Sequence, residues 1–377
     1  MQEDVMEFAD IVRRPYAAIA SAKEKSGKCA IGCFPMYVPH EVVDAAWMLP
    51  VDIYGGSGGM TVAAEYFESI NCYPMRNAFE LLLTGQLSVL DGAIFGTTCN
   101  AAKSGGDIWR SLRVLPHFHQ LTLPNRVRGA HALEYFQQQI ERLCESLAVW
   151  GGRTIGREEL AASIRRYNHS RNLLEQLAEI SQQHPEMLTP QDFTIVRAAG
   201  SFMLRSDYVS LLTRLLADIA AKTSDSEEEW VGLALVGNPC DMPLFELLSI
   251  IHEAGAVVVA DETTSGRRAW VKVSERLEPI AALARRYLDM PPCPTQCDDN
   301  MDAQYEYLLG LATTGRALGV VFVRPLYCDP AGMVYPVLAN RLSAANVPTL
   351  RLDLDGREGA RGQVRTRLQA FVEMVRR

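Results

Sequence analysis

The sequence predicts an α/β protein with two domains, each built on a parallel sheet, and a helical segment between them. Short apolar stretches alternate with stretches of helical periodicity near both ends of the 377 residues, an order typical of parallel sheets covered by helices. The middle of the chain has only helical periodicity. We therefore expect an N-terminal α/β domain over residues 1–128, a helical segment over 129–225 and a C-terminal α/β domain over 226–377.

Four strands are predicted in the N-terminal domain, in the apolar stretches 29–38, 50–54, 91–98 and 117–124. Helical spacing follows the first strand, and an amphipathic helix is expected over residues 73–87. The stretch Asp91–Arg110, DGAIFGTTCNAAKSGGDIWR, has the pattern of a strand followed by a helix, with Cys99 at the joint. A strand end that faces the start of a helix is where α/β proteins place ligands.

Three long helices are expected in the middle segment, at residues 131–150, 157–183 and 206–222. Apolar side chains recur there with helical spacing, and opposite charges lie four residues apart. Residues 223–229, TSDSEEE, are polar and acidic, and we interpret them as a solvated linker without a function of their own.

Strand and helix patterns alternate again from residue 230 onward. Strands are expected at 230–238, 256–262, 319–325 and 348–354, and helices at 243–255, 279–290, 302–315, 334–347 and 362–377. Both ends of the chain therefore predict a Rossmann-like parallel-sheet domain, and the fold class expected for the whole chain is α/β.

The composition limits the classes of partner. Hydrophobic residues make up 48% and charged residues 22% of the chain, as in ordinary globular proteins, and the formal net charge is −8. A general electrostatic attraction to nucleic acid is not expected at this charge, so we predict no nucleic-acid partner. The first residues lack the apolar core of a signal peptide, and no apolar run is long enough to span a bilayer. We expect a cytoplasmic protein without a membrane partner.

Three of the nine cysteines share one predicted setting. Cys72 lies where a helix begins, and Cys99 and Cys328 each lie after a strand and before a helix. Because such joints lie at one edge of a parallel sheet, three thiols far apart in sequence could converge on one crevice. Helix N-termini favour anions and lower the pKa of a thiol, which suits thiolate ligands of a cluster. Buried cysteines that act only as small apolar side chains remain the alternative.

The other cysteines do not form a recognisable zinc motif, because no C-x2-C pair is present. Cys29 and Cys33 form one C-x3-C pair and Cys293 and Cys297 form another. The second pair could act as metal ligands, as labile thiols or as a plain loop. The roles of these four and of Cys240 are left open.

The chain resembles a subunit of the 2-hydroxyacyl-CoA dehydratase and benzoyl-CoA reductase family. The matching stretches run in family order over nearly the whole chain: YVPHEVVDAAWMLPVDIYGG, CYPMRNAFELLLTGQLSVLDGAIFGTTCNAAK, AGAVVVADETTSGRR, YCDPAGMVYPVLANRLSAANVPTLRLDLD and GQVRTRLQAFVEM. The resemblance implies a 4Fe–4S cluster bound by Cys72, Cys99 and Cys328, in the crevice between the two α/β domains. Three cysteine ligands would leave one iron with an exchangeable site, where four would favour simple electron transfer.

The resemblance further implies an enzyme subunit that acts on an aromatic or 2-hydroxyacyl-CoA thioester. A separate ATP-dependent activator protein would deliver the electron, and the chain itself has no G-x-x-x-x-G-K-S/T motif for ATP. A homologous subunit or a second copy of the chain would complete the enzyme. The acyl group, and the choice between dehydration and ring reduction, are not given by the sequence.

Weaker predictions concern side chains near the first strand–helix turn. Tyr37 is expected to line the acyl site as a substrate-binding residue, and Glu41 to act in catalysis by moving a proton, provided that its pKa is raised. A carboxylate in the first turn of a helix is also favoured by the helix dipole, which is the structural alternative for Glu41. Arg267 and Arg268 could meet CoA phosphates, although a solvated loop is the favoured interpretation.

Three other functions stay open. A homodimeric reductase of the same family could carry a larger double-cubane 8Fe–9S cluster, which needs further ligands such as Cys33, Cys240, Cys293 and Cys297. The chain could instead be a non-catalytic electron-transfer or scaffold subunit. A metal-free ligand-binding protein with two α/β lobes is the third alternative.

Overall fold

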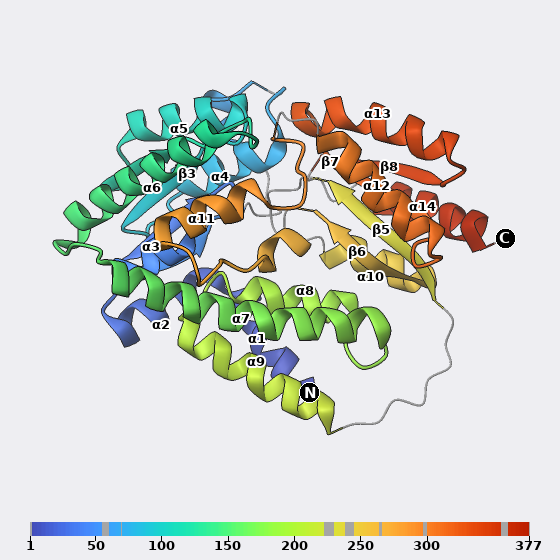
Figure 1. The fold of residues 1–377 in the computed structure, drawn as a ribbon, viewed down its shortest axis with the longest axis horizontal. Coiled ribbons are helices and arrows are strands. Elements are labelled where there is room, and N and C mark those ends of the chain that lie inside the picture. The colour runs from blue at the N-terminus through green and yellow to red at the C-terminus, as the bar shows by residue number, and fades with distance from the viewer. Residues whose placement is uncertain are drawn as a thin grey trace.

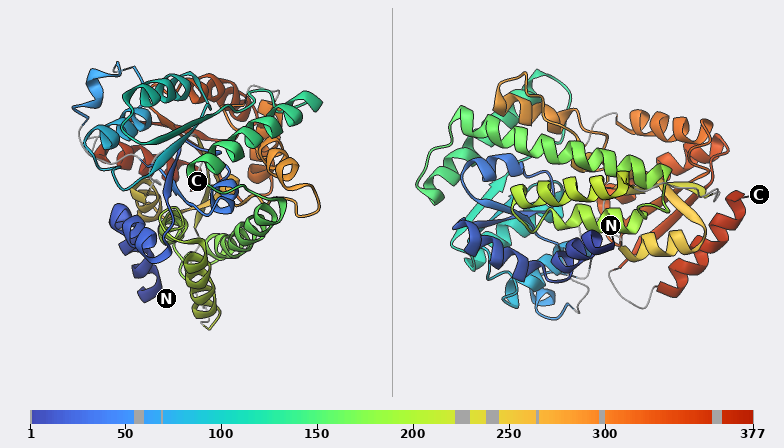
Figure 2. Two further views of the ribbon diagram at one scale, coloured as in Figure 1. Left: turned by 90° about the vertical axis from the view of Figure 1, so that its left-hand side faces the viewer. Right: turned by 90° about the horizontal axis from the view of Figure 1, so that it is seen from below.

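A computed structural model gives the architecture of the chain (Figure 1). It describes residues 2–54, 60–68, 70–221, 230–237, 245–263, 266–296, 300–355 and 361–376. The linker at 223–229 and the residues Cys240 and Cys297 lie outside the described residues. Two separate sheets lie at opposite ends of the molecule, and helices from the middle of the chain lie beneath and between them in Figures 1 and 2.

The first sheet has four parallel strands in the order β2-β1-β3-β4. Their bounds are β1 Ala30–Phe34, β2 Leu49–Asp52, β3 Gly92–Gly96 and β4 His117–Leu121. Helices α2 (Pro15–Ser26), α3 (His40–Ala45), α4 (Tyr73–Leu83) and α5 (Asn100–Leu112) belong to this half, with the short 3-10 helix η1 (Ala63–Glu65). All four predicted strands are confirmed.

The second sheet repeats this plan, with four parallel strands in the order β6-β5-β7-β8. The strands are β5 Val231–Gly237, β6 Ala256–Glu262, β7 Gly319–Pro325 and β8 Thr349–Leu354. The helices are α10 (Phe245–Glu253), α12 (Asn300–Thr313), α13 (Asp329–Ala344) and α14 (Arg361–Arg376). The predicted fold class, α/β with two Rossmann-like domains, is confirmed.

Both faces of the second sheet are covered because side chains of a strand alternate between them. Leu233 and Leu235 of β5 pack in the core formed with α10 and α14. Ala234 and Val236, one residue further on, pack in the core formed with α12 and α13. Strands buried on both faces read as continuous apolar runs, which explains why the sequence pattern identifies them.

Four helices make up the middle segment: α6 (Ala130–Gly151), α7 (Arg157–Gln183), α8 (Pro190–Ala199) and α9 (Arg205–Ala220). The N-terminal helix α1 (Gln2–Arg13) packs against α8 and α9. Phe8 of α1 lies in the same apolar core as Leu177 of α7 and Tyr208 of α9. The extreme N-terminus is therefore part of the helical layer.

After β6 the chain returns to the first half of the molecule. The 3-10 helix η2 (Arg267–Trp270) packs on α7, and α11 (Pro279–Leu288) packs on α6 and α7. Leu283 and Tyr287 of α11 share a core with Val42 of α3 and Phe136 of α6. This excursion brings residues from the two halves of the chain to one place, and it is not predicted by the sequence. The domain boundaries at residues 128 and 225 stay a prediction.

Replacing Gly232 by alanine is expected to destabilise the second sheet. A Cβ added at Gly232 of β5 would lie 2.1 Å from the carbonyl oxygen of Arg316, which is a backbone atom and cannot rotate away. We expect Gly232→Ala to lower the free energy of unfolding by about 1–3 kcal/mol, measured by urea denaturation.

Gly310 provides the matched control. It is exposed inside α12, and nothing lies within 4 Å of a Cβ added there. Gly310→Ala should stabilise the protein by up to about 1 kcal/mol through helix propensity. Two substitutions with the same effect would contradict the backbone contact at Gly232.

Candidate functional site

The three predicted cysteines hold equivalent positions in the fold. Cys72 is the N-cap of α4, Cys99 is the N-cap of α5, and Cys328 is the N-cap of α13. Each has extended backbone dihedrals there. The backbone amides of Met75 and Ala331, in the first turns of α4 and α13, favour the charged forms of Cys72 and Cys328 and so act to lower their pKa values. The backbone amide of Ala102 donates to the sulfur of Cys99 at 3.4 Å. The predicted strand–helix setting is thus present at Cys99 and Cys328, whereas Cys72 begins a helix that follows η1 and a loop.

The charges of these thiols act on one another across the two halves of the chain. Burial raises the pKa of Cys72 to about 11, and a negative charge on Cys99 adds to the rise. Burial raises the pKa of Cys328 to about 12, and charges on Cys72, Cys99 and Cys293 add to it. The expectation of lowered thiol pKa values is therefore wrong for Cys72 and Cys328, because burial outweighs the helix dipole.

Among the described residues, no three His, Cys, Asp or Glu side chains are grouped tightly enough to hold a single metal ion. A cluster of four irons is wider than one ion, so its ligands lie further apart. The metal role of Cys72, Cys99 and Cys328 stays a prediction.

The other described cysteines have different surroundings. Cys293 is buried, with its sulfur 3.3 Å from the hydroxyl of Thr295. Cys33 is buried within β1, whereas Cys29 is exposed and Cys144 on α6 is half-buried. Of these, Cys293 is the one whose charge acts on Cys328.

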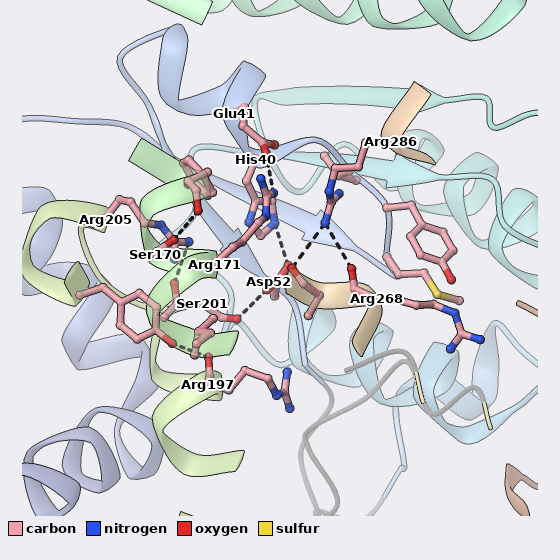
Figure 3. Close-up of a pocket in the computed structure, with 18 of the residues that line it drawn as sticks. His40, Glu41, Asp52, Ser170, Arg171, Arg197, Ser201, Arg205, Arg268 and Arg286 are labelled. Carbon is pink, nitrogen blue, oxygen red and sulfur yellow. Dashed lines mark hydrogen bonds and ion pairs between the residues drawn. The ribbon is translucent and has the colours of Figure 1, made fainter. Parts of the chain in front are cut away.

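A pocket of about 180 Å³, partly open to solvent, lies where the β1–α3 turn meets helices α7, α8 and α9 (Figure 3). Its charged lining comes from separate elements: His40 and Glu41 of α3, Asp52 of β2, Arg171 of α7, Arg197 of α8, Arg205 of α9, Arg268 of η2 and Arg286 of α11.

Tyr37 lies in the wall of this pocket, and its role as a substrate-binding residue stays a prediction. Its backbone has a positive φ of 67°, and its ring packs edge-on against Tyr287 of α11 at 5.4 Å. Burial raises the pKa of Tyr37, and the neighbouring charge of Cys293 raises it further, while Arg268 opposes the rise. Tyr37 therefore lines the pocket and is close enough to Cys293 for their charges to interact, and Cys293 in turn acts on Cys328.

Glu41 lies in the same pocket, but its environment is not the one that a proton shuttle requires. Its side chain is 1% exposed, and Nη2 of Arg171 donates to its Oε1 at 2.5 Å. Burial opposes its ionisation, but the positive charges of Arg171 and Arg286 outweigh burial and lower the pKa to about 2. The condition of a raised pKa is not met here, and a catalytic role for Glu41 stays a prediction.

A second charged pair in the pocket is not identified from the sequence. Nε2 of His40 lies 2.9 Å from Oδ1 of Asp52, and the hydroxyl of Ser201 donates to Oδ2 at 2.6 Å. Burial alone would lower the pKa of His40, but Asp52 and Cys33 raise it to about 10. His40 is therefore positively charged at neutral pH.

Arg268 corrects the interpretation of residues 267–268 as a solvated loop. It is 1% exposed and donates to the main-chain carbonyls of Pro291, Pro292, Glu262 and Thr263. Arg267, by contrast, is partly exposed and forms an ion pair with Glu262 at 2.7 Å. Arg267 therefore lies near the surface, and Arg268 is buried.

The family of the chain follows from comparison with known proteins. A family model described as 2-hydroxyglutaryl-CoA dehydratase, D-component, matches residues 35–375. The chain belongs to this family. The predicted resemblance is confirmed, and with it the prediction that the chain is an enzyme subunit.

Members of the family that resemble the chain do so over their full length. The (R)-phenyllactyl-CoA dehydratase beta subunit of Clostridium sporogenes is 25% identical over 370 residues, 98% of each chain. One of the subunits of benzoyl-CoA reductase from Thauera aromatica is 26% identical, over 98% of this chain and 99% of that one. The beta subunit of (R)-2-hydroxyglutaryl-CoA dehydratase from Acidaminococcus fermentans is 26% identical, over 98% of each. All three relatives are named as subunits.

In the described part of this family member, no helix combines the length and the apolar character needed to cross a membrane. The cytoplasmic location stays a prediction.

Removing only one partner of the Glu41–Arg171 ion pair is expected to destabilise the protein. Arg171→Met leaves a buried carboxylate without its nearest cation, and we expect it to lower the free energy of unfolding by about 3–5 kcal/mol. The double variant Glu41→Gln/Arg171→Met removes both charges and should recover a large part of that loss. Urea denaturation at pH 7 measures both variants, and equal losses in the two would contradict the pairing.

The same pair predicts a pH dependence. The pKa of Glu41 is depressed in the folded chain from 4.5 to about 2, so its contribution to stability is present above about pH 4.5 and is lost as the pH falls towards 2. The difference in unfolding free energy between the wild type and Glu41→Gln should therefore shrink over this window. A difference that stays constant from pH 7 to pH 3 would show that Glu41 is not held as a carboxylate.

Proposed function

We propose that the chain is the iron–sulfur subunit of a radical dehydratase or reductase that acts on an aromatic or 2-hydroxyacyl-CoA thioester. In this proposal Cys72, Cys99 and Cys328 are the protein ligands of one 4Fe–4S cluster. Support comes from the family, whose named members include dehydratases of acyl-CoA substrates and a benzoyl-CoA reductase.

One observation carries the proposal: three cysteines that cap helices lie close enough for their charges to interact. Two come from the first half of the chain and one from the second, yet charges on Cys72 and Cys99 act on Cys328. With pKa values of about 11 and 12, Cys72 and Cys328 are uncharged thiols at pH 7 when no metal is bound. Holding them as thiolate ligands requires a nearby positive charge, which iron would supply. Backbone amides at three helix N-termini suit the sulfurs of a bound cluster. The donor set therefore fits an iron–sulfur cluster.

When bound, a cluster with three cysteine ligands supplies one-electron chemistry at low potential and has one iron without a protein ligand. The chain contributes the positions of its own residues. The N-caps of α4, α5 and α13 hold the three sulfurs. Tyr37, in the wall of the neighbouring pocket, forms the side from which an acyl group would approach. The arginines of the pocket would position the substrate and exclude water around it.

Partners follow from what the sequence lacks. No G-x-x-x-x-G-K-S/T motif is present, so ATP hydrolysis is assigned to a separate activator protein that delivers the electron. A homologous subunit or a second copy of the chain completes the enzyme, in keeping with relatives that are themselves named as subunits.

A second candidate, the double-cubane 8Fe–9S cluster, has one observation in its favour. Cys293 acts electrostatically on both Cys328 and Tyr37, so a fourth thiol is present beside the three. Iron content distinguishes the candidates, because a single cubane contains four irons per chain and the larger cluster eight.

Removing one proposed ligand should remove the cluster. Wild-type protein purified without oxygen is expected to be brown and to contain about four irons and four sulfides per chain. Cys99→Ala should lose most of both, whereas Cys144→Ala on α6 should retain them. Undiminished iron in the Cys99→Ala variant would refute the ligand assignment.

The isolated chain is expected to be inactive without a partner that supplies electrons. Neither ATP hydrolysis nor conversion of an acyl-CoA should be detectable with the chain alone. If the chain alone hydrolysed ATP and converted a CoA thioester, the assignment of these steps to a separate activator would be wrong.

A further inference from the structure

The pocket beside Tyr37 has more cationic than anionic side chains. Its two carboxylates are already paired. Glu41 lies 2.5 Å from Arg171. Asp52 lies 2.9 Å from His40. Among the residues that the structure describes, the pocket has four further arginines that form no ion pair with a carboxylate: Arg197, Arg205, Arg268 and Arg286. Positive charge is therefore in excess in this enclosed space, and burying a charge without a counter-charge is costly.

The excess charge acts directly on Arg286. Burial and the nearby charge of Arg171 lower its pKa to about 9, although guanidinium groups ordinarily keep their charge in proteins. Nε of Arg286 donates to the carbonyl of Val271 at 2.6 Å, which holds the side chain in this position. A bound anion would offset the repulsion between the two arginines.

Two buried donors of the pocket lack a hydrogen-bond acceptor. Within the described part of the chain, the hydroxyl of Tyr37 and Nε of Arg205 form no hydrogen bond of normal geometry. The thiol of Cys293, which lies near Tyr37, is only a weak acceptor. The guanidinium of Arg205 is held over the rings of Tyr167 at 4.2 Å and Tyr208 at 5.1 Å. Because buried donors in proteins are almost always satisfied, these two indicate an acceptor that binds in the pocket.

The size of the pocket limits that acceptor to a small group. Its volume of about 180 Å³ is below the range of about 300–1,000 Å³ that is usual for sites of drug-sized ligands. The pocket is partly open to solvent, so an ion can enter. Arg197 and Arg268 are 9% and 1% exposed, so the ion must exchange its water for guanidinium donors.

The donors approach from several sides. The charged side chains come from α3, α7, α8, α9, η2 and α11. Figure 3 shows Arg197, Arg205 and Arg286 on different sides of the pocket. A carboxylate presents two oxygens in one plane, whereas a tetrahedral oxyanion has acceptors in four directions and carries more charge. Guanidinium groups bind phosphate oxygens with paired, charge-assisted hydrogen bonds. The arrangement therefore favours a tetrahedral anion.

We propose that this pocket binds one small tetrahedral oxyanion that is free in solution, represented by inorganic phosphate. The anion accepts hydrogen bonds from the hydroxyl of Tyr37 and from the guanidinium groups of Arg197 and Arg205. The pocket has room for one such group. A bound phosphate therefore excludes the acyl group that would otherwise be positioned by these arginines, and this consequence alone rests on the proposed function. The concentration of free phosphate then limits the access of substrate.

The test is a calorimetric titration of the full-length wild-type chain with sodium phosphate at constant ionic strength. Phosphate should bind saturably at one site per chain, and sodium chloride should not. Arg197→Gln and Arg205→Gln should each weaken binding by about 10- to 100-fold, the value of one charge-assisted hydrogen bond. The matched control Arg142→Gln, at an exposed arginine of α6, should leave it unchanged. Circular dichroism checks that each variant is folded.

Tyr37→Phe provides a milder variant, because it removes only the hydroxyl. It should weaken phosphate binding by about 3- to 10-fold, the value of one neutral hydrogen bond. Unchanged affinity in this variant would contradict the assignment of the hydroxyl as a donor to the anion.

Two results would overturn the proposal as a whole. The first is an absence of saturable phosphate binding to the wild type, which does not depend on any variant. The second is displacement of phosphate by an equimolar amount of desulfo-CoA, which would assign the pocket to the phosphates of CoA. Because the titration requires neither iron nor turnover, its failure is distinguishable from failure of the proposed function, which is read from iron content.

The competition with substrate has its own measurement. In an assay with a supplied electron donor, phosphate should raise the KM for the acyl-CoA and leave kcat unchanged. A lowered kcat at unchanged KM would contradict a shared pocket.

Discussion

In a parallel sheet the carboxyl ends of all strands lie at one edge. The arrangement of the functional groups in this protein depends on that constraint. In the first sheet, Cys99 follows β3 and Tyr37 follows β1. In the second sheet, Cys328 follows β7. Figure 1 shows β5 and β6 of the second sheet pointing towards the middle of the molecule. Groups from distant parts of the sequence therefore lie near one another without any local sequence signal that links them.

Two electrostatic environments adjoin in this region. One contains buried thiols, of which Cys72 and Cys328 have raised pKa values and are uncharged at pH 7 without a metal. The other contains arginines and a protonated histidine in excess over carboxylates. Bound iron would favour the thiolate form in the first, and an anion would offset the positive charge of the second. Tyr37 and Cys293 lie between the two environments.

Local patterns in the sequence predict much of this fold, because strands buried on both faces read as apolar runs. Strands β1, β2, β3, β5, β6 and β7 are predicted in this way, and β4 and β8 are also predicted although they are less buried and carry polar side chains. Helices α1, α2 and α8 are missed. Phe8 of α1, for example, is recognisable as core only when it packs against α7 and α9. The pocket arginines are missed for a related reason. Arg171 does carry a signal, because it lies on the buried face of α7, four residues after Tyr167 and three before Leu174.

The pKa values of the thiols could not be predicted from local sequence either. Position at a helix N-terminus is a local property, and it suggests lowered values. Burial depends on the whole fold, and it raises the values at Cys72 and Cys328. The return of η2 and α11 to the first half of the molecule is likewise a tertiary feature, and it supplies both Arg268 and Arg286 to the pocket.

The most direct test of the central claim is the position of iron in a crystal of the holoprotein grown without oxygen. Anomalous scattering at the iron absorption edge locates the metal independently of any assignment of ligands. The account predicts one compact iron site per chain, bonded to the sulfurs of Cys72, Cys99 and Cys328 and bordering the pocket wall formed by Tyr37. Iron bonded to other cysteines, or a site in which any of these three sulfurs faces away from the metal, would contradict it.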